Sequence, residues 1–132
     1  MKLRDLFENE TAQSKFDAVV YNPKTVFFHE SPGLVWESFY DHGIEDNAVF
    51  CTVNKESDFV VGDKTIICFH IPKGNKVLVS PDMRYESVDD LVQEHPKITG
   101  ADVSINRNIP SAWILSIEEE TVNGKMTRHS LD

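Results

Sequence analysis

Polar side chains that could form a reactive site occur at the ends of three strand-like segments. His29 and Ser31 follow the apolar start of VFFHESPG, at residues 26–33. Thr52 lies near the end of AVFCTVN, and Asp102 begins the strand-like part of ADVSINRNIPSAWILSI. A histidine at a strand end is either a hydrogen-bonded core residue or one wall of a ligand pocket. Because each residue alone is more often structural, only their ordered combination indicates a site.

A second pair of acids, Glu118 and Glu120, follows the apolar segment WILSI. Alternate residues of a strand lie on the same face, so both carboxylates can point into one cleft. Such a run more commonly forms a solvated face. Both interpretations remain open at the level of sequence.

Familiar cofactor motifs do not occur in the sequence. We find no GxGxxG after a strand, no Walker A segment and no GxSxG segment. Cys51 and Cys68 lie in apolar runs without CxxC or paired Cys/His spacing, so we expect reduced core cysteines and no metal site.

The candidate residues are carried by segments with the composition of strands. Runs of β-branched and aromatic residues predict strands at 25–29, 48–53, 65–71, 76–80, 102–105 and 113–117. Residues 16–21 predict either a loop or an edge strand, and residues 3–7 have the apolar spacing of a short helix. Asn123-Gly124, between two β-prone trios, predicts a two-residue hairpin turn of type I′.

Two further short helices are expected from their end signals. One would begin with Ser31 as N-cap and Pro32 as first helical residue, and would end at Gly43. The other would begin with Ser87 as its cap and would stop before Pro96.

Strands joined by short turns pair antiparallel, and the helices are few and short. We therefore predict an α+β fold of mostly antiparallel small sheets with short helices. The 132 residues suit one domain, 1–132, with its own core.

The charge of the chain limits its partners. Thirteen Lys and Arg against 22 Asp and Glu give a net charge of −9. This charge disfavours direct binding of nucleic acid and favours either simple solubility or a protein partner with a basic surface. We see neither a run of about 18 apolar residues nor a secretory signal, so we expect a cytoplasmic protein without a membrane span.

Taken in order, these segments resemble the ADP-ribosyltransferase-like fold. Small members begin with a strand ending in a YHGTS or FHTSP type of segment, then a short helix and a glycine, here FFHESPGLVWESFYDHG. A strand of FFT or FST type follows, here VFCT, and then a hairpin, here CFHIPKGNKVLV. The last motif is an acid opening a strand before an IP..WI segment, here DVSINRNIPSAWILSI. The resemblance covers residues 26–117 and implies a split-sheet architecture with a cleft between two small sheets.

The resemblance implies that NAD is a consumed substrate rather than a retained cofactor. Asp102 matches the position of the catalytic acid, a carboxylate that stabilises the positive charge developing on ribose as nicotinamide leaves. Most members have glutamate at this position, one methylene longer. In some members an ExE pair carries the acid, so Glu118 and Glu120 are the alternative.

The resemblance also implies residues that bind NAD. His29 would hydrogen-bond the adenosine-side ribose, with Ser31 assisting, and Thr52 would lie beside the nicotinamide pocket. An aromatic ring would stack on the nicotinamide, for which Phe59 or Tyr40 is the candidate.

The implied activity is transfer of ADP-ribose from NAD to a side chain of a protein target. A small acidic enzyme of this kind fits a phage effector or inhibitor of a host defence protein, acting in the host cytoplasm. The alternative from another class is a non-enzymatic acidic protein that blocks the nucleic-acid-binding surface of a basic partner. A structural or accessory protein with the same sheet pattern is a third possibility.

Overall fold

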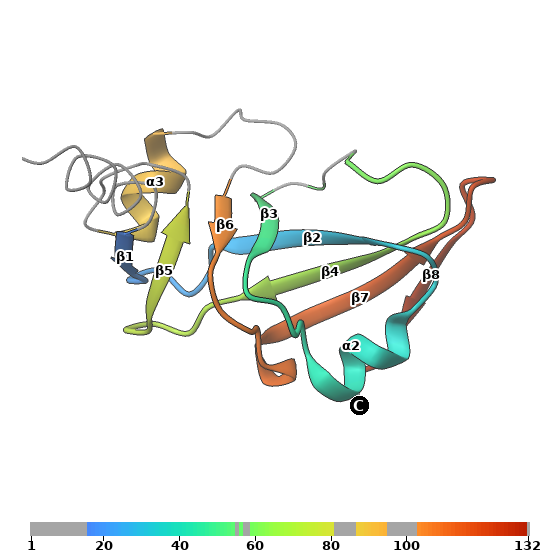
Figure 1. The fold of residues 1–132 in the computed structure, drawn as a ribbon, viewed down its shortest axis with the longest axis horizontal. Helices are drawn as coiled ribbons and strands as arrows, with labels where there is room; N and C mark the ends of the chain where they lie inside the picture. Colours follow the sequence, from blue (N-terminus) through green and yellow to red (C-terminus); the bar gives the residue numbers. More distant parts are fainter. Residues whose placement is uncertain (1–15, 55, 57–58, 81–86, 95–102, 132) are drawn as a thin grey trace, which may run out of the picture.

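The computed structural model describes residues 16–54, 56, 59–80, 87–94 and 103–131. Within these ranges the chain forms an eight-stranded sheet with two short α-helices and one 3-10 helix (Figure 1). In chain order the elements are β1 (Phe16–Val19), β2 (Val26–Pro32), α2 (Trp36–His42), β3 (Val49–Val53), β4 (Lys64–His70), β5 (Lys76–Ser80), α3 (Val88–Glu94), β6 (Val103–Ile105), η1 (Ser111–Trp113), β7 (Ile114–Glu120) and β8 (Met126–His129).

The strands lie in the order β1-β5-β6-β3-β2-β4-β7-β8, and every neighbouring pair is antiparallel. The predicted α+β class, with mostly antiparallel strands and short helices, is therefore confirmed. None of the helices among the described residues is long and apolar enough to span a membrane.

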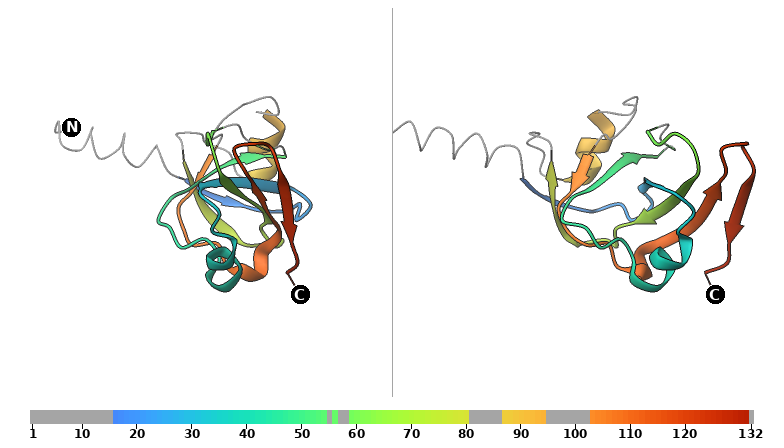
Figure 2. Two further views of the ribbon diagram at one scale, coloured as in Figure 1. Left: turned by 90° about the vertical axis from the view of Figure 1, so that its right-hand side faces the viewer. Right: turned by 45° about the vertical axis from the view of Figure 1, so that its right-hand side comes forward.

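The sheet divides into two groups of strands between β2 and β3. β2 pairs with β4 along its whole length, from Val26 to Pro32. It pairs with β3 only at two positions, where Phe27 lies opposite Val53 and Phe28 opposite Thr52. The group β1-β5-β6-β3 then runs across the direction of the group β2-β4-β7-β8 (Figure 1). Figure 2 shows α3 beside β5 at one end, and α2 beside β7 at the other.

The core contains apolar side chains from both groups of strands. Phe27 and Phe69 stack with ring centroids 5.4 Å apart, and Ile67 and Ile117 beside them are fully buried. Burying one such side chain stabilises the fold by about 1.5–3 kcal/mol. The two cysteines are free thiols, with Cys51 buried in the core and Cys68 half-buried.

Helix α2 begins later than the sequence predicts. Ser31 and Pro32 were expected as its N-cap and first residue, but they are the last two residues of β2 and pair with β4. The helix begins at Trp36, and the preceding N–H of Val35 donates to the hydroxyl of Thr65 at 3.0 Å. The prediction is wrong because pairing with β4 outweighs the local capping signal.

The end of α2 is as predicted. The N–H of Gly43 donates to the carbonyl of Phe39 at 2.8 Å, and Gly43 has a φ of 70° with a ψ of −157°. This conformation is essentially restricted to glycine. The next residue, Ile44, forms an isolated bridge with Ile109, so the helix end is fixed to the segment before η1.

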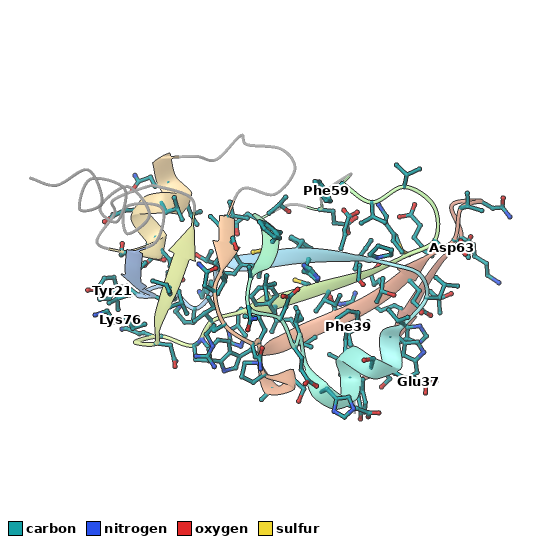
Figure 3. All side chains as sticks on the ribbon, viewed as in Figure 1. Tyr21, Glu37, Phe39, Phe59, Asp63 and Lys76 are labelled. Atoms are coloured by element: carbon teal, nitrogen blue, oxygen red, sulfur yellow. The ribbon has the colours of Figure 1, made fainter. Side chains whose placement is uncertain are left out.

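The turn between β7 and β8 differs from the predicted type. A type I′ turn needs a positive φ at both central residues, but Gly124 has one (84°) and Asn123 does not. The N–H of Gly124 instead donates to the carbonyl of Thr121. The neighbouring N–H of Val122 donates to a carboxylate oxygen of Asp63 at 2.7 Å, and Asp63 lies beside the hairpin (Figure 3). We attribute the longer turn to this contact with Asp63, which lies outside the hairpin.

The other predicted elements occur with small shifts of their bounds. Residues 16–21 contain the edge strand β1, and β3, β4 and β5 cover the expected strands. The hydroxyl of Ser87 accepts the N–H of Asp90 at 3.1 Å, which confirms the cap of α3. The helix predicted at residues 3–7 lies outside the described residues.

The close approach at Gly43 gives a test of the fold. A Cβ at this position would lie 2.1 Å from the carbonyl oxygen of Ile109, whereas a Cβ at Gly74, with a φ of 84°, would meet nothing within 4 Å. We expect Gly74→Ala to lower the free energy of unfolding by about 1–2 kcal/mol, from backbone strain alone. Gly43→Ala should lower the free energy of unfolding by about 3 kcal/mol or more, because the backbone at Ile109 must move. Urea unfolding measures both values, and equal losses would contradict the described contact.

Candidate ligand-binding site

The separation of β2 from β3 brings the side chain of His29 against a backbone carbonyl. Beyond the pair of Phe28 and Thr52 the two strands are no longer hydrogen-bonded. Here Nδ1 of His29 lies 2.7 Å from the carbonyl oxygen of Phe50. The imidazole ring thus takes the place that a backbone N–H of β2 would have in a continuous sheet. This bond satisfies a carbonyl that would otherwise lose its partner.

The same bond fixes the tautomer of His29. A carbonyl oxygen only accepts hydrogen bonds, so Nδ1 carries the proton. Burial lowers the pKa of the ring from 6.5, more than the bond to Phe50 and the charges of Asp46 and Glu30 raise it. The ring is therefore neutral at pH 7, and Nε2 holds a lone pair that can accept a hydrogen bond from a hydroxyl group.

A small pocket of about 110 Å³ lies where the strands separate. Its lining residues come from β2, β3 and the connection after β3: Phe28, His29, Glu30, Phe50, Cys51, Thr52 and Phe59. Sites that enclose a whole drug-sized ligand measure roughly 300–1,000 Å³, so this pocket has room for one ring of a larger molecule.

Aromatic side chains dominate the pocket. Phe50 and Phe59 are 58% and 69% exposed, an unusual state for such large apolar rings, and Phe28 is half-buried. Aromatic walls of this kind suit the face of a flat ring. The pocket thus combines stacking surfaces with a neutral imidazole.

Three of the predicted NAD-binding residues meet at this pocket. His29, Thr52 and Phe59 all line it, although they are distant in sequence. Ser31 is not among the lining residues, and Tyr40 lines a different, open hollow beside α2. Phe59 is therefore the aromatic candidate that lies next to His29.

The predicted catalytic acid, Asp102, lies outside the described residues. Strand β6 is described from Val103, which lies opposite Cys51 of the pocket lining. The role of Asp102 therefore stays a prediction.

The alternative acids lie on β7, which β4 separates from β2. Glu118 and Glu120 alternate on β7, opposite Ile66 and Lys64 of β4. Burial raises the pKa of the Glu56 carboxyl, and the charges of Glu118 and Glu120 raise it further, so these carboxylates are close in space. Neither Glu118 nor Glu120 is among the residues that line the pocket.

Glu30 is a pocket residue that the sequence analysis did not single out. Its neighbour His29 lies on the other face of β2, yet both line the pocket. Among the described residues, β2 has no strand partner on this edge beyond Phe28, so successive residues of β2 border the pocket. An acid directly after a histidine at a strand end was the available signal, but it resembled the start of a turn.

Comparison with models of protein families, with curated proteins and with solved structures finds no match to this chain. The described residues also contain no group of three or more His, Cys, Asp or Glu side chains that could hold a metal ion.

The protonation of the His29 ring can be measured directly by NMR. We expect its titration midpoint in the folded protein to lie below 6.5, because burial disfavours the charged form. Between the folded midpoint and 6.5 the unfolded chain binds more protons, so folding stability should fall as the pH falls through this window. Two-dimensional NMR of the imidazole nitrogens should show the Nδ1–H tautomer at pH 7.5.

A matched variant isolates the contribution of this ring. His29→Asn keeps an N–H donor near the position of Nδ1 and removes the titration. We expect it to lose the part of the pH dependence of unfolding that falls just below pH 6.5. A titration midpoint of His29 at or above 6.5 in the wild-type protein would contradict the lowered pKa that burial gives this ring.

Proposed function

We propose that the chain is a mono-ADP-ribosyltransferase that binds NAD as a consumed substrate and transfers ADP-ribose to a protein target. The observation that supports this best is the pocket at the β2–β3 separation. It gathers His29, Thr52 and Phe59, the residues for which the resemblance implies contacts with NAD, from three segments of the chain. The separation of the sheet into two groups agrees with a cleft between two small sheets.

The chemistry of the pocket suits the ring that leaves. Breaking the bond between ribose C1′ and the ring nitrogen returns an electron pair to the ring and leaves positive charge on the ribose. Nicotinamide departs neutral, and the acceptor side chain loses a proton when its new bond to C1′ forms. The aromatic walls would hold the flat ring, and Nε2 of His29 would accept a hydrogen bond from a ribose hydroxyl. Asp102 is the proposed carboxylate beside C1′.

The proposed target is a protein with a basic surface. The net charge of −9 favours such a partner and disfavours nucleic acid itself. A host defence protein in the cytoplasm, attacked by a phage effector, is the target class that we propose. The proposal rests on charge and on the resemblance together.

A second candidate function is an acidic protein that blocks a basic partner without chemistry. Exposed apolar side chains support it, since Val61 is 94% exposed and Val122 is 73% exposed beside the acidic strand β7. Such a surface can join a partner through both apolar contact and charge. Binding would then weaken steeply with salt and would not depend on the pocket.

The first test is NAD binding by calorimetry together with nicotinamide release. Phe59→Ala should weaken binding roughly twofold to tenfold through lost stacking. His29→Ala should weaken it roughly fivefold through a lost hydrogen bond of about 1 kcal/mol. Asp102→Ala should abolish nicotinamide release and leave most of the binding.

His70→Ala is the matched control. Its Nδ1 also lies near a backbone carbonyl, that of Pro23 at 3.1 Å, but His70 does not line the pocket. We expect NAD binding of this variant to equal that of the wild type. Absence of binding at millimolar NAD would exclude the enzyme and leave the acidic binding protein.

A further inference from the structure

The three consecutive glutamates of β7 have different surroundings on the two faces of the sheet. Glu119 contacts the rest of the chain: its Oε1 lies 2.7 Å from Nε2 of His129, and its Oε2 accepts the N–H of Trp36, at the start of α2, at 3.4 Å. Alternate residues of a strand lie on opposite faces, so Glu118 and Glu120 lie on the other face. Both are half-exposed. The middle glutamate of the run therefore holds α2 and β8, while its neighbours are open to solvent.

Strand pairing arranges the side chains of this second face in two rows across β4, β7 and β8. The first row contains Lys64, Glu120 and Met126, and the second contains Ile66, Glu118 and Arg128. Residues directly opposite each other in antiparallel strands have Cβ atoms about 4.5–5.5 Å apart, so the members of a row are neighbours. The rows are buried at β4 and become exposed toward the edge strand β8, where Met126 is 43% exposed.

Exposed apolar side chains border the first row. Val61 is 94% exposed and Val122 is 73% exposed. The carboxylate of Asp63 accepts the N–H of Val122 at 2.7 Å, so the connection before β4 lies against the turn between β7 and β8. Large apolar groups that gather on a surface mark sites of protein interaction. We define the open face as the half-exposed acids together with these apolar residues: Glu118, Glu120, Val61, Val122 and Met126.

Carboxylates outnumber cations at this face. Nζ of Lys64 lies 3.2 Å from Oε1 of Glu30 and 3.8 Å from Oε2 of Glu120, so one cation is shared by two carboxylates. Burial raises the pKa of the Glu56 carboxyl, and the charges of Glu118 and Glu120 raise it further, so these acids repel one another. The ionised groups, two cations and four carboxylates with a sum of 2 − 4 = −2, are Lys64, Arg128, Glu30, Glu56, Glu118 and Glu120. An added cation would relieve this repulsion.

We propose that the open face binds a segment of a protein partner in which Lys or Arg side chains stand next to aliphatic or aromatic ones. The basic groups bind at Glu118 and Glu120, and the apolar groups pack on the neighbouring valines and methionine. Charge complementarity selects this occupant over nucleic acid and over a second copy of this chain, whose own net charge is −9. This inference rests on the proposed function only in calling the partner the target of ADP-ribosylation.

The open face lies beside the pocket that we propose for NAD. Val61 is two residues away from Phe59, which lines that pocket. A segment that packs on Val61 therefore lies close to the place where ADP-ribose would be transferred. The surface that recognises the partner and the site of chemistry then share one connection of the chain.

Three short peptides test the open face on the wild-type chain without NAD. The first combines arginine with leucine, the second replaces leucine with serine, and the third replaces arginine with glutamate. We expect the first to bind most tightly, the second roughly tenfold more weakly, and the third not at all. Affinity for the first peptide should fall as salt is raised. The backbone NMR shift changes should gather at Val61, Val122 and Met126.

Two variants with the same change of charge locate the site. Glu118→Gln combined with Glu120→Gln should weaken binding of the first peptide roughly threefold to tenfold. Glu37→Gln combined with Glu45→Gln is the control, because it removes two exposed carboxylates from α2 and the connection after it (Figure 3). It should change the affinity by less than about twofold. Val122→Ser isolates the apolar contribution and should weaken binding roughly threefold.

The outcomes separate this inference from the proposed function. Equal losses in the two charge variants would overturn it, since binding would then follow net charge alone. Shift changes centred away from the open face, or no binding of the first peptide, would also overturn it, even where NAD is bound and nicotinamide released. Peptide binding at the open face without any turnover of NAD would support the inference and count against the transferase. Where a variant does not fold, the shift changes of the wild-type protein decide.

Discussion

The hydrogen bond between His29 and the carbonyl of Phe50 is the contact on which the arrangement of this molecule depends. Strands that leave a sheet expose backbone groups that must find another partner or face water. β2 leaves β3 after two paired positions, and an imidazole ring takes over where backbone pairing stops. The ring adds a side-chain contact between the two groups of strands, beside the two backbone pairs that join them. The pocket exists because the strands separate at this point.

The opposite edge of β2 shows why the site stays in place. There β2 pairs with β4 at every residue, and Lys64 of β4 reaches back to Glu30. A buried ion pair contributes little net stability, because desolvation offsets much of the attraction. It does fix the position of both side chains. One edge of β2 is therefore rigidly held, while the other is open to a ligand.

Sequence patterns predicted the strands well, because β-branched and aromatic runs such as 65–71 need only local information. The predictions from sequence patterns were wrong where contacts with residues distant in sequence determine the local structure. Pairing with β4 extended β2 through Ser31 and Pro32 and removed the expected helix start. The turn at Asn123-Gly124 differs because Asp63, far away in sequence, holds a neighbouring N–H. The grouping of His29 with Phe59 was suggested only by resemblance, since spacing alone does not say which strands become neighbours.

The strand order also sets how the chain must fold. β7 and β8 join through a short turn, but the other pairings connect distant segments, such as Val49 with Ile105 and Lys64 with Glu120. Closing such long loops costs conformational entropy before the strand contacts can stabilise the fold, so a topology of this kind folds slowly. The residues of the pocket meet only when β2, β3 and β4 have found one another. A chain caught before that stage would show unpaired β-strand edges and its apolar core to other chains, which makes its folding intermediates prone to aggregation.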